Sequence, residues 1–415
     1  MSRIPQHPFQ ESTDRKSVFL LFFGSILAFS AYFFLRTQIY PILNTAGGII
    51  MLAPLITRFP RAIQVLKMPP GKLWFFAIIF SAGMLVLRMM KNGLDSDTLL
   101  IGDLYQFSLA FAFLTAGFTF SVPQKIFCKA IVFYGLAVSL GGFFLMKYQG
   151  GGLTEVSGEY ALSAKNSICV IWAIAGALLF WNYLYGYSGK IIKWLGIGAF
   201  TLVCICILYG RGRTAFLALI SFSVLALYKK FGKGRWYIGL LVLLILAIFS
   251  WLFFHFFGTP ELLKESFLKN KNEDDLNSIS SGRLELILMG LEGFLAHPFW
   301  GCGDFNGTMP IHCYPVRILA GRGLIGGFGY MIFYFYLCKT CMKKLADRSL
   351  GKFDDIGVYI MIVPLFGSLG EICQPYGPGS VSGIAFMLFG IYLRKEFEEK
   401  IHPRDNPISA YRRAA

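Results

Sequence analysis

The chain has 415 residues, of which 55% are hydrophobic and 15% charged, and its mean hydropathy is +0.58. This composition excludes an ordinary soluble protein of that length, in which about a quarter of the residues are charged. The formal net charge of +16 would favour a nucleic-acid partner in a soluble protein. Here, however, the cations lie in short loops between apolar runs, so we expect no nucleic acid and predict an all-α polytopic membrane protein.

Apolar runs that could cross a bilayer recur along the whole chain. A membrane-spanning helix takes about 20 residues, and the runs predict about twelve such spans. We place them at residues 17–35, 38–57, 73–90, 99–120, 126–146, 166–185, 191–209, 214–228, 237–257, 316–338, 356–372 and 379–393. The first run has a charged lead and no clear small-residue cleavage site, so we expect a retained span rather than a removed signal peptide.

These spans divide the chain into four parts. Residues 1–257 hold the first nine expected transmembrane helices, and residues 258–315 form one long loop with the candidate catalytic segment. Residues 316–393 hold the last three helices, and residues 394–415 form a basic tail. Lysine and arginine gather in alternate loops and in this tail, which is typical of the cytoplasmic side. We therefore expect both termini in the cytoplasm and the long loop on the outer side.

The second half of the long loop predicts a helix. Ser280 or Ser281 can cap its first turn. Apolar residues then recur at helical spacing up to the turn at His297-Pro298: Leu284, Ile287, Leu288, Leu291, Phe294 and Leu295. The pattern predicts an amphipathic helix that lies on the membrane or packs on the helical bundle.

Two residues of this loop can carry chemistry. His312 lies just before the span at 316–338, so we expect its imidazole at the membrane boundary, where it can accept a proton near pH 7. A structural hydrogen bond is the alternative role for this histidine. Arg283 offers a planar, permanently charged fork that suits phosphate oxygens, and its alternative role is a surface salt bridge with Glu285 or with an acid of the preceding loop.

Further polar residues are expected at the same outer face. Arg211 and Arg213 alternate with glycines in the short turn GRGR, where they either bind an anion or anchor the helix ends. Glu371 ends the eleventh expected span, and Lys165-Asn166 begins the sixth. Because the topology brings cations and a base to one membrane surface, the set suits a lipid diphosphate substrate.

The nine cysteines show no spacing that indicates a metal site, so we expect no bound metal. Cys302 and Cys313 both lie in the outer loop, and the sequence leaves open whether they form a disulfide. The glycine pattern at 301–303 lacks the Lys-Ser/Thr that follows a nucleotide-binding loop.

Four segments, in order, resemble the O-antigen ligase family of bacterial membrane glycosyltransferases, which is related to the O-antigen polymerases. They read SGEYALSAKNSICVIW, ILYGRGRTAFLAL, SSGRLELILMGLEGFLAHPFWGCGDF and IHCYPVRILAGRGLIGGFGYM. The resemblance covers the second half of the chain. It implies a GT-C-like helical fold in the bacterial inner membrane, with the active face in the periplasm.

Position by position, the resemblance implies that Arg213 and Arg283 bind the donor diphosphate and that His312 is the catalytic base. Glu371 falls where such ligases can place an acid. Cys313 departs from the family's usual Asn after the histidine, and Arg211 is an extra cation. The implied reaction is metal-independent, inverting transfer of a glycan from undecaprenyl diphosphate to a sugar hydroxyl of lipid A–core, without a cofactor.

Other functions stay open. A polymerase would use the same donor and extend a second lipid-linked glycan, but the single sizeable outer loop favours the ligase. A transporter of lipid-linked sugars would call for charged residues near mid-membrane and an internal repeat, and neither stands out. A scaffold without activity would leave the clustered outer arginines and histidine without a role.

Overall fold

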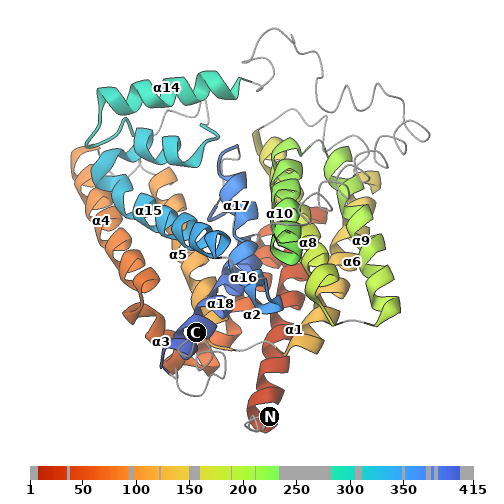
Figure 1. The fold of residues 1–415 in the computed structure, drawn as a ribbon. Helices are drawn as coiled ribbons and strands as arrows, with labels where there is room; N and C mark the ends of the chain where they lie inside the picture. The colour runs from red at the N-terminus through yellow and green to blue at the C-terminus, as the bar shows by residue number, and fades with distance from the viewer. Residues whose placement is uncertain are drawn as a thin grey trace.

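The computed structural model describes residues 8–34, 38–92, 98–120, 123–148, 159–187, 189–210, 212–232, 282–303, 311–347, 351–370, 375–377 and 382–401. Within these ranges the regular structure is helical. The α-helices are α1 (Pro8–Ser30), α2 (Ile39–Thr57), α3 (Phe59–Lys67), α4 (Pro69–Asn92), α5 (Thr98–Phe118), α6 (Gln124–Tyr148), α8 (Glu159–Tyr185), α9 (Lys190–Tyr209), α10 (Arg213–Phe231), α14 (Arg283–Ala296), α15 (Tyr314–Ala346), α16 (Ile356–Tyr359), α17 (Ile362–Gly367) and α18 (Gly383–Ile401). Two short 3₁₀ helices, η1 (Ala31–Phe34) and η4 (Phe353–Asp355), complete the set. Figure 1 shows the long helices side by side as a bundle, with α14 lying across one end.

Seven of the described helices are long and apolar enough to cross a membrane. They cover Arg15–Phe34, Ile39–Thr57, Gln124–Leu145, Asn166–Tyr185, Lys190–Tyr209, Arg213–Phe231 and Tyr314–Ala346. Helices α3 and α4 meet at a bend of 79° and would together make one more span. The prediction of a polytopic helical membrane protein is therefore confirmed. Twelve spans stay a prediction, because the ninth expected span, at 237–257, lies outside the described residues.

The span expected at 356–372 is interrupted. Its described part consists of two short helices, α16 and α17, separated by a turn at Ile360 and Met361. Pro364 explains the interruption, because a proline ring collides with the carbonyl four residues earlier, here that of Ile360. The Ile360 carbonyl instead accepts a hydrogen bond from the Val363 N–H at 3.1 Å. A single helix was thus the wrong expectation for this stretch.

Helix α8 is the most buried of the seven candidate membrane spans. Of the membrane-crossing stretch Asn166–Tyr185, 89% is buried. Apolar side chains surround this helix on all sides, as expected for a span packed within protein. Trp181 is fully buried and donates a hydrogen bond from Nε1 to the Phe353 carbonyl at 3.0 Å, which joins α8 to η4.

One end of the bundle gathers the basic loops. Arg58, Arg61 and Arg394 all donate to the carbonyl oxygen of Thr119, at 3.0, 3.5 and 3.0 Å. Helix α10 carries Lys229 and Lys230 in its last turn at this end and begins at Arg213 at the other. Its 19 residues separate the two ends by roughly 28 Å at 1.5 Å per residue.

Helix α15 is broken at Gly323, where φ is 63° and ψ is −170°. The segment 298–303 replaces the hydrogen bonds that the break removes. Cys302 N–H donates to the Ala320 carbonyl (2.8 Å), Gly303 N–H to Gly321 (3.1 Å), Leu324 N–H to Pro298 (2.8 Å) and Ile325 N–H to Phe299 (3.1 Å). Such replacement is required within a membrane, where water does not satisfy the backbone. The HPFWGCG and GRG stretches therefore form one structural unit.

Helix α14 packs on α15 through its glycine side. A Cβ at Gly290 would lie 2.8 Å from Val316 Cγ1 of α15 and 2.7 Å from Ile311 Cδ1 just before it, so only glycine fits here without movement. The helix begins one position later than expected, after Gly282, which takes a left-handed φ of 76° and replaces the expected serine cap. The leucine stripe points away from the bundle, since Leu288 is 53% and Leu295 is 74% exposed.

Candidate functional site

Three separate parts of the chain meet at the end of the bundle that lies opposite the basic loops. Arg213 is the first residue of α10, Arg283 is the first residue of α14, and His312 lies two residues before α15. A fourth part arrives with Gly370, in the turn that follows α17. Arg213, Arg283 and His312 are all half-buried. The predicted convergence of these residues on one face is therefore found among the described residues.

Arg283 is held by the start of α10. Its Nη1 donates a hydrogen bond to Thr214 Oγ1 at 3.0 Å. Gly370 leaves room for this contact, because a Cβ there would lie 2.8 Å from Thr214 Oγ1 and 3.0 Å from Arg283 Nη1. The arginine fork is thus fixed against two other chain segments, an arrangement that suits recognition of an anion with defined geometry.

The tight turn between α9 and α10 places Arg213. Gly212 N–H donates to the Ile207 carbonyl at 3.0 Å and so closes the turn. A Cβ on Gly212 would approach Cys169 Sγ of α8 to 2.5 Å. The glycines of the GRGR motif therefore permit close packing on α8, which fixes the direction in which α10 and its first residues leave the turn.

His312 lies in a partly desolvated position beside Arg283. Burial lowers its pKa from 6.5 to about 4, and the positive charge of Arg283 adds to this effect. Its Nδ1 is buried and has no hydrogen-bond partner in the part of the chain that the structure describes. The backbone near it is fixed, because Tyr314 N–H donates to the Ser368 carbonyl at 2.8 Å. The imidazole is therefore neutral near pH 7 and able to accept a proton.

The other predicted site residues are less well defined. Asn166 is half-buried on α8, one turn before Cys169, and therefore on the helix face that meets the α9–α10 turn. Lys165 belongs to the same helix, but its side chain lies outside the described part. Arg211 and Glu371 also lie outside the described residues. The roles expected for these last three stay predictions.

Among the described residues, neither Cys302 nor Cys313 forms a disulfide. The Cys302 Sγ donates to the Gly293 carbonyl at 3.0 Å, which holds the 298–303 segment against α14. The disulfide that the sequence left open is therefore not formed in this structure.

Sequence reasoning missed several residues at this end of the bundle. Thr214 and Gly370 carry no signal that would single them out before the fold is known. Arg317 and Arg322 did carry one, because they are charged residues in or next to an expected span, and such residues are costly in a membrane unless they have a partner. Both pair with Asp103 of α5, which itself lies within an expected span.

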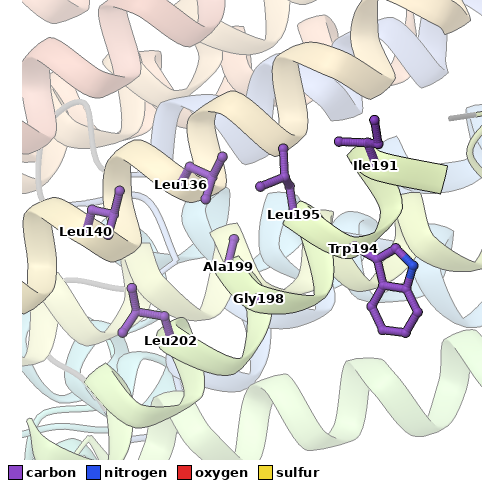
Figure 2. A pocket seen from close by; sticks show the side chains of 8 residues that line it. All are labelled: Leu136, Leu140, Ile191, Trp194, Leu195, Gly198, Ala199 and Leu202. Carbon is purple, nitrogen blue, oxygen red and sulfur yellow. The ribbon is translucent and has the colours of Figure 1, made fainter. Parts of the chain in front are cut away.

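A shallow groove elsewhere on the bundle has a different character. Figure 2 shows apolar side chains of α6 and α9 around a hollow of about 490 Å³. Ile191 and Trp194 lie in the first turns of α9, the end away from Arg213. The groove therefore takes no part in the polar site, and its lining is that of a lipid-facing surface.

The comparison with known families agrees with the geometry. The family described as O-antigen ligase matches residues 196–331, a segment that holds Arg213, Arg283 and His312. The match confirms the resemblance to the O-antigen ligases. The match over this segment supports a function of the O-antigen ligase or polymerase type in general. No curated protein matches the chain.

Proposed function

We propose that this protein is an O-antigen ligase that moves a glycan from undecaprenyl diphosphate to a sugar hydroxyl of lipid A–core. The observation that carries the proposal is the placement of Arg283. It hydrogen bonds to the start of α10, next to Arg213, and its charge also acts on the imidazole of His312. A fixed cation thus lies beside a neutral base, as transfer from a diphosphate requires.

In the proposed reaction, Arg213 and Arg283 bind the donor diphosphate through their guanidinium groups. The acceptor hydroxyl oxygen attacks the anomeric carbon on the face opposite the diphosphate, and the bond between that carbon and the diphosphate oxygen breaks. His312 accepts the hydroxyl proton. The negative charge that develops on the leaving diphosphate is stabilised by the two arginines. The anomeric centre is inverted, and no metal is needed for charge stabilisation.

We propose that the site faces the periplasm from the bacterial inner membrane. Support comes from the charge distribution, since the basic loops and the last turn of α10 lie at the other end of the bundle. The long loop at 258–315 would then be periplasmic and the tail at 394–415 cytoplasmic. In a cysteine-free background, Glu285→Cys should react with a membrane-impermeant maleimide added to intact spheroplasts, whereas Lys400→Cys should react only after lysis. The reverse pattern would invert the topology.

The function is tested with purified protein, undecaprenyl-diphosphate glycan, EDTA, and either lipid A–core or no added acceptor. Product on lipid A–core that is lost in His312→Ala and in Arg283→Ala supports the metal-independent ligase. His297→Ala is the matched control, because His297 is an exposed histidine beyond the end of α14. Longer lipid-linked chains formed without lipid A–core would make the protein a polymerase. Donor binding without any product would favour a transporter.

A further inference from the structure

An ion cluster within the bundle joins α5 to α15. Arg317 Nη2 lies 3.1 Å from one carboxylate oxygen of Asp103, and Arg322 Nη2 pairs with the other. The side chains of Arg322 and Asp103 are nearly buried, at 6% and 13% exposed, whereas that of Arg317 is 21% exposed. Charged groups inside a membrane bundle are costly and mark functional positions more often than structural ones.

The two arginines of this cluster differ in how tightly they are packed. Arg322 sits in the break of α15, where its backbone N would lie 2.5 Å from a Cβ on Gly301, so the 298–303 segment packs tightly upon it. This fixed arginine orients Asp103. The second carboxylate oxygen of Asp103 then holds Arg317, the most accessible of the three. A guanidinium has five N–H donors, so one arginine can bind a carboxylate and further acceptors at the same time.

A buried phenol, Tyr314, lies beside Arg317 and packs against a second one, Tyr376. The Arg317 guanidinium lies 5.6 Å from the ring centre of Tyr314, and the Tyr314 and Tyr376 rings contact each other at 5.4 Å. Both tyrosines are 3% exposed, and neither hydroxyl has a hydrogen-bond partner within the described ranges. Burying a hydroxyl without a partner is costly. The Tyr314 hydroxyl beside this cation could therefore take a polar ligand as its partner.

The cluster adjoins the candidate site. Arg317 N–H donates to the Cys313 carbonyl at 2.9 Å, so Arg317 lies in the first turn of α15. This helix begins two residues after His312. Arg213, Arg283 and His312 thus lie at the end of the bundle, and Arg317 lies about one helical turn closer to its middle. Arg317 therefore follows His312 by five residues, in the first turn of the helix that begins next to it.

We propose that Arg317 is a further substrate-binding cation, positioned by Asp103, that binds an anionic group of the saccharide substrate, a phosphate or a carboxylate. This inference rests on the proposed function. The anionic group belongs either to the donor diphosphate or to a charged sugar of the acceptor. Arg322 serves as the fixed anchor of Asp103. A purely structural role, in which the three residues only join α5 to the broken α15, predicts lower stability but unchanged Michaelis constants in the folded fraction.

The experiment compares Arg317→Gln, Arg317→Lys, Asp103→Asn and the Asp103→Asn/Arg317→Gln double variant. Each is purified in detergent, and only the monodisperse fraction is assayed. We expect Arg317→Gln to raise one KM about tenfold or more, the loss typical of a charge-assisted hydrogen bond. Arg317→Lys should recover part of this loss, because lysine keeps the charge without the planar fork. Asp103→Asn should act in the same direction, and the double variant should be no worse than Arg317→Gln.

The arms of the experiment separate the two sources of the anion. A raised KM for the donor assigns Arg317 to the diphosphate. If Arg317→Gln raises the KM for lipid A–core but not the KM for a dephosphorylated acceptor, Arg317 binds an acceptor phosphate. If the KM is raised for both acceptors, Arg317 binds a carboxylate. Arg15→Gln, an exposed arginine of α1, is the control and should leave both constants unchanged. Unchanged constants in Arg317→Gln, or additive losses in the double variant, would overturn the inference.

Failure of the inference differs from failure of the proposed function. If His312→Ala and Arg283→Ala abolish transfer while Arg317→Gln keeps the wild-type constants, only the inference fails. If the wild-type protein transfers nothing, the proposed function fails. The role of Arg317 is then tested by the rise in melting temperature that inorganic pyrophosphate causes in the wild type and in Arg317→Gln. A stabilisation that Arg317→Gln weakens supports an anion site at this residue. Equal stabilisation of both proteins, or none, overturns it.

Discussion

The pH dependence of transfer tests the role of His312 most directly. Its pKa lies at about 4 instead of 6.5, first because of burial and second because of Arg283. An imidazole with the ordinary pKa would be about 76% protonated at pH 6, whereas one with a pKa of about 4 is about 1% protonated. At pH 6 we therefore expect kcat/KM close to its maximum, rather than reduced about fourfold. Transfer assays between pH 4 and 8 measure this.

The two kinetic constants should differ in their acidic limbs. The profile of kcat/KM reports the free enzyme, and that of kcat reports the enzyme with substrate bound. A bound diphosphate brings negative charge close to the imidazole and raises its pKa. We therefore expect the acidic limb of kcat at a higher pH than that of kcat/KM. In Arg283→Gln, the limb of the remaining kcat/KM should move upward but stay below 6.5, because burial persists.

Some results would contradict this reasoning. An acidic limb of kcat/KM centred near pH 6.5 would mean that His312 is not desolvated in the free enzyme. A limb that does not move in Arg283→Gln would show that the arginine does not act on the imidazole. Stability offers a second measurement. The unfolded chain takes up this proton near pH 6.5 and the folded protein only near 4, so the folded state loses stability as the pH falls between these values. His312→Gln should remove that part of the loss.

Three substitutions test the packing around the site. Thr214→Val removes the hydrogen bond to Arg283 and should lower kcat/KM about tenfold, because a hydrogen bond to a charged group contributes about 1.5–3 kcal/mol. Gly370→Ala places a methyl group 3.0 Å from Arg283 Nη1, so the arginine should swing away and transfer should fall to a similar degree; wild-type transfer would refute this placement. Gly323→Ala forces a φ of 63° and ψ of −170° on a side chain, which costs about 1–3 kcal/mol, and should lower the melting temperature in detergent. Gly198→Ala, whose Cβ meets nothing within 4 Å, is the control for both glycines and should behave as wild type.

The sequence predicted the membrane class, the seven described helices that are long and apolar enough to cross a membrane, and the meeting of Arg213, Arg283 and His312 at one face. Hydropathy suffices for the spans, because a membrane admits helices whose backbone is satisfied internally. Arg213, Arg283 and His312 were predicted because each ends or precedes an apolar run, so that topology alone brings them to one face. The leucine stripe of α14 was equally visible, but periodicity does not tell which side of a helix meets the protein.

Only the tertiary structure decided how these residues are held. Thr214 and Gly370 act through distances to Arg283 that no local pattern encodes. The break of α15 at Gly323 depends on hydrogen bonds from residues 298–303, and the cluster at Asp103 joins residues more than 200 positions apart. A charged residue inside an apolar run signals that a partner exists. Which partner it has is settled by packing between distant helices, because the cost of burying a charge is relieved only by the group that the fold places beside it.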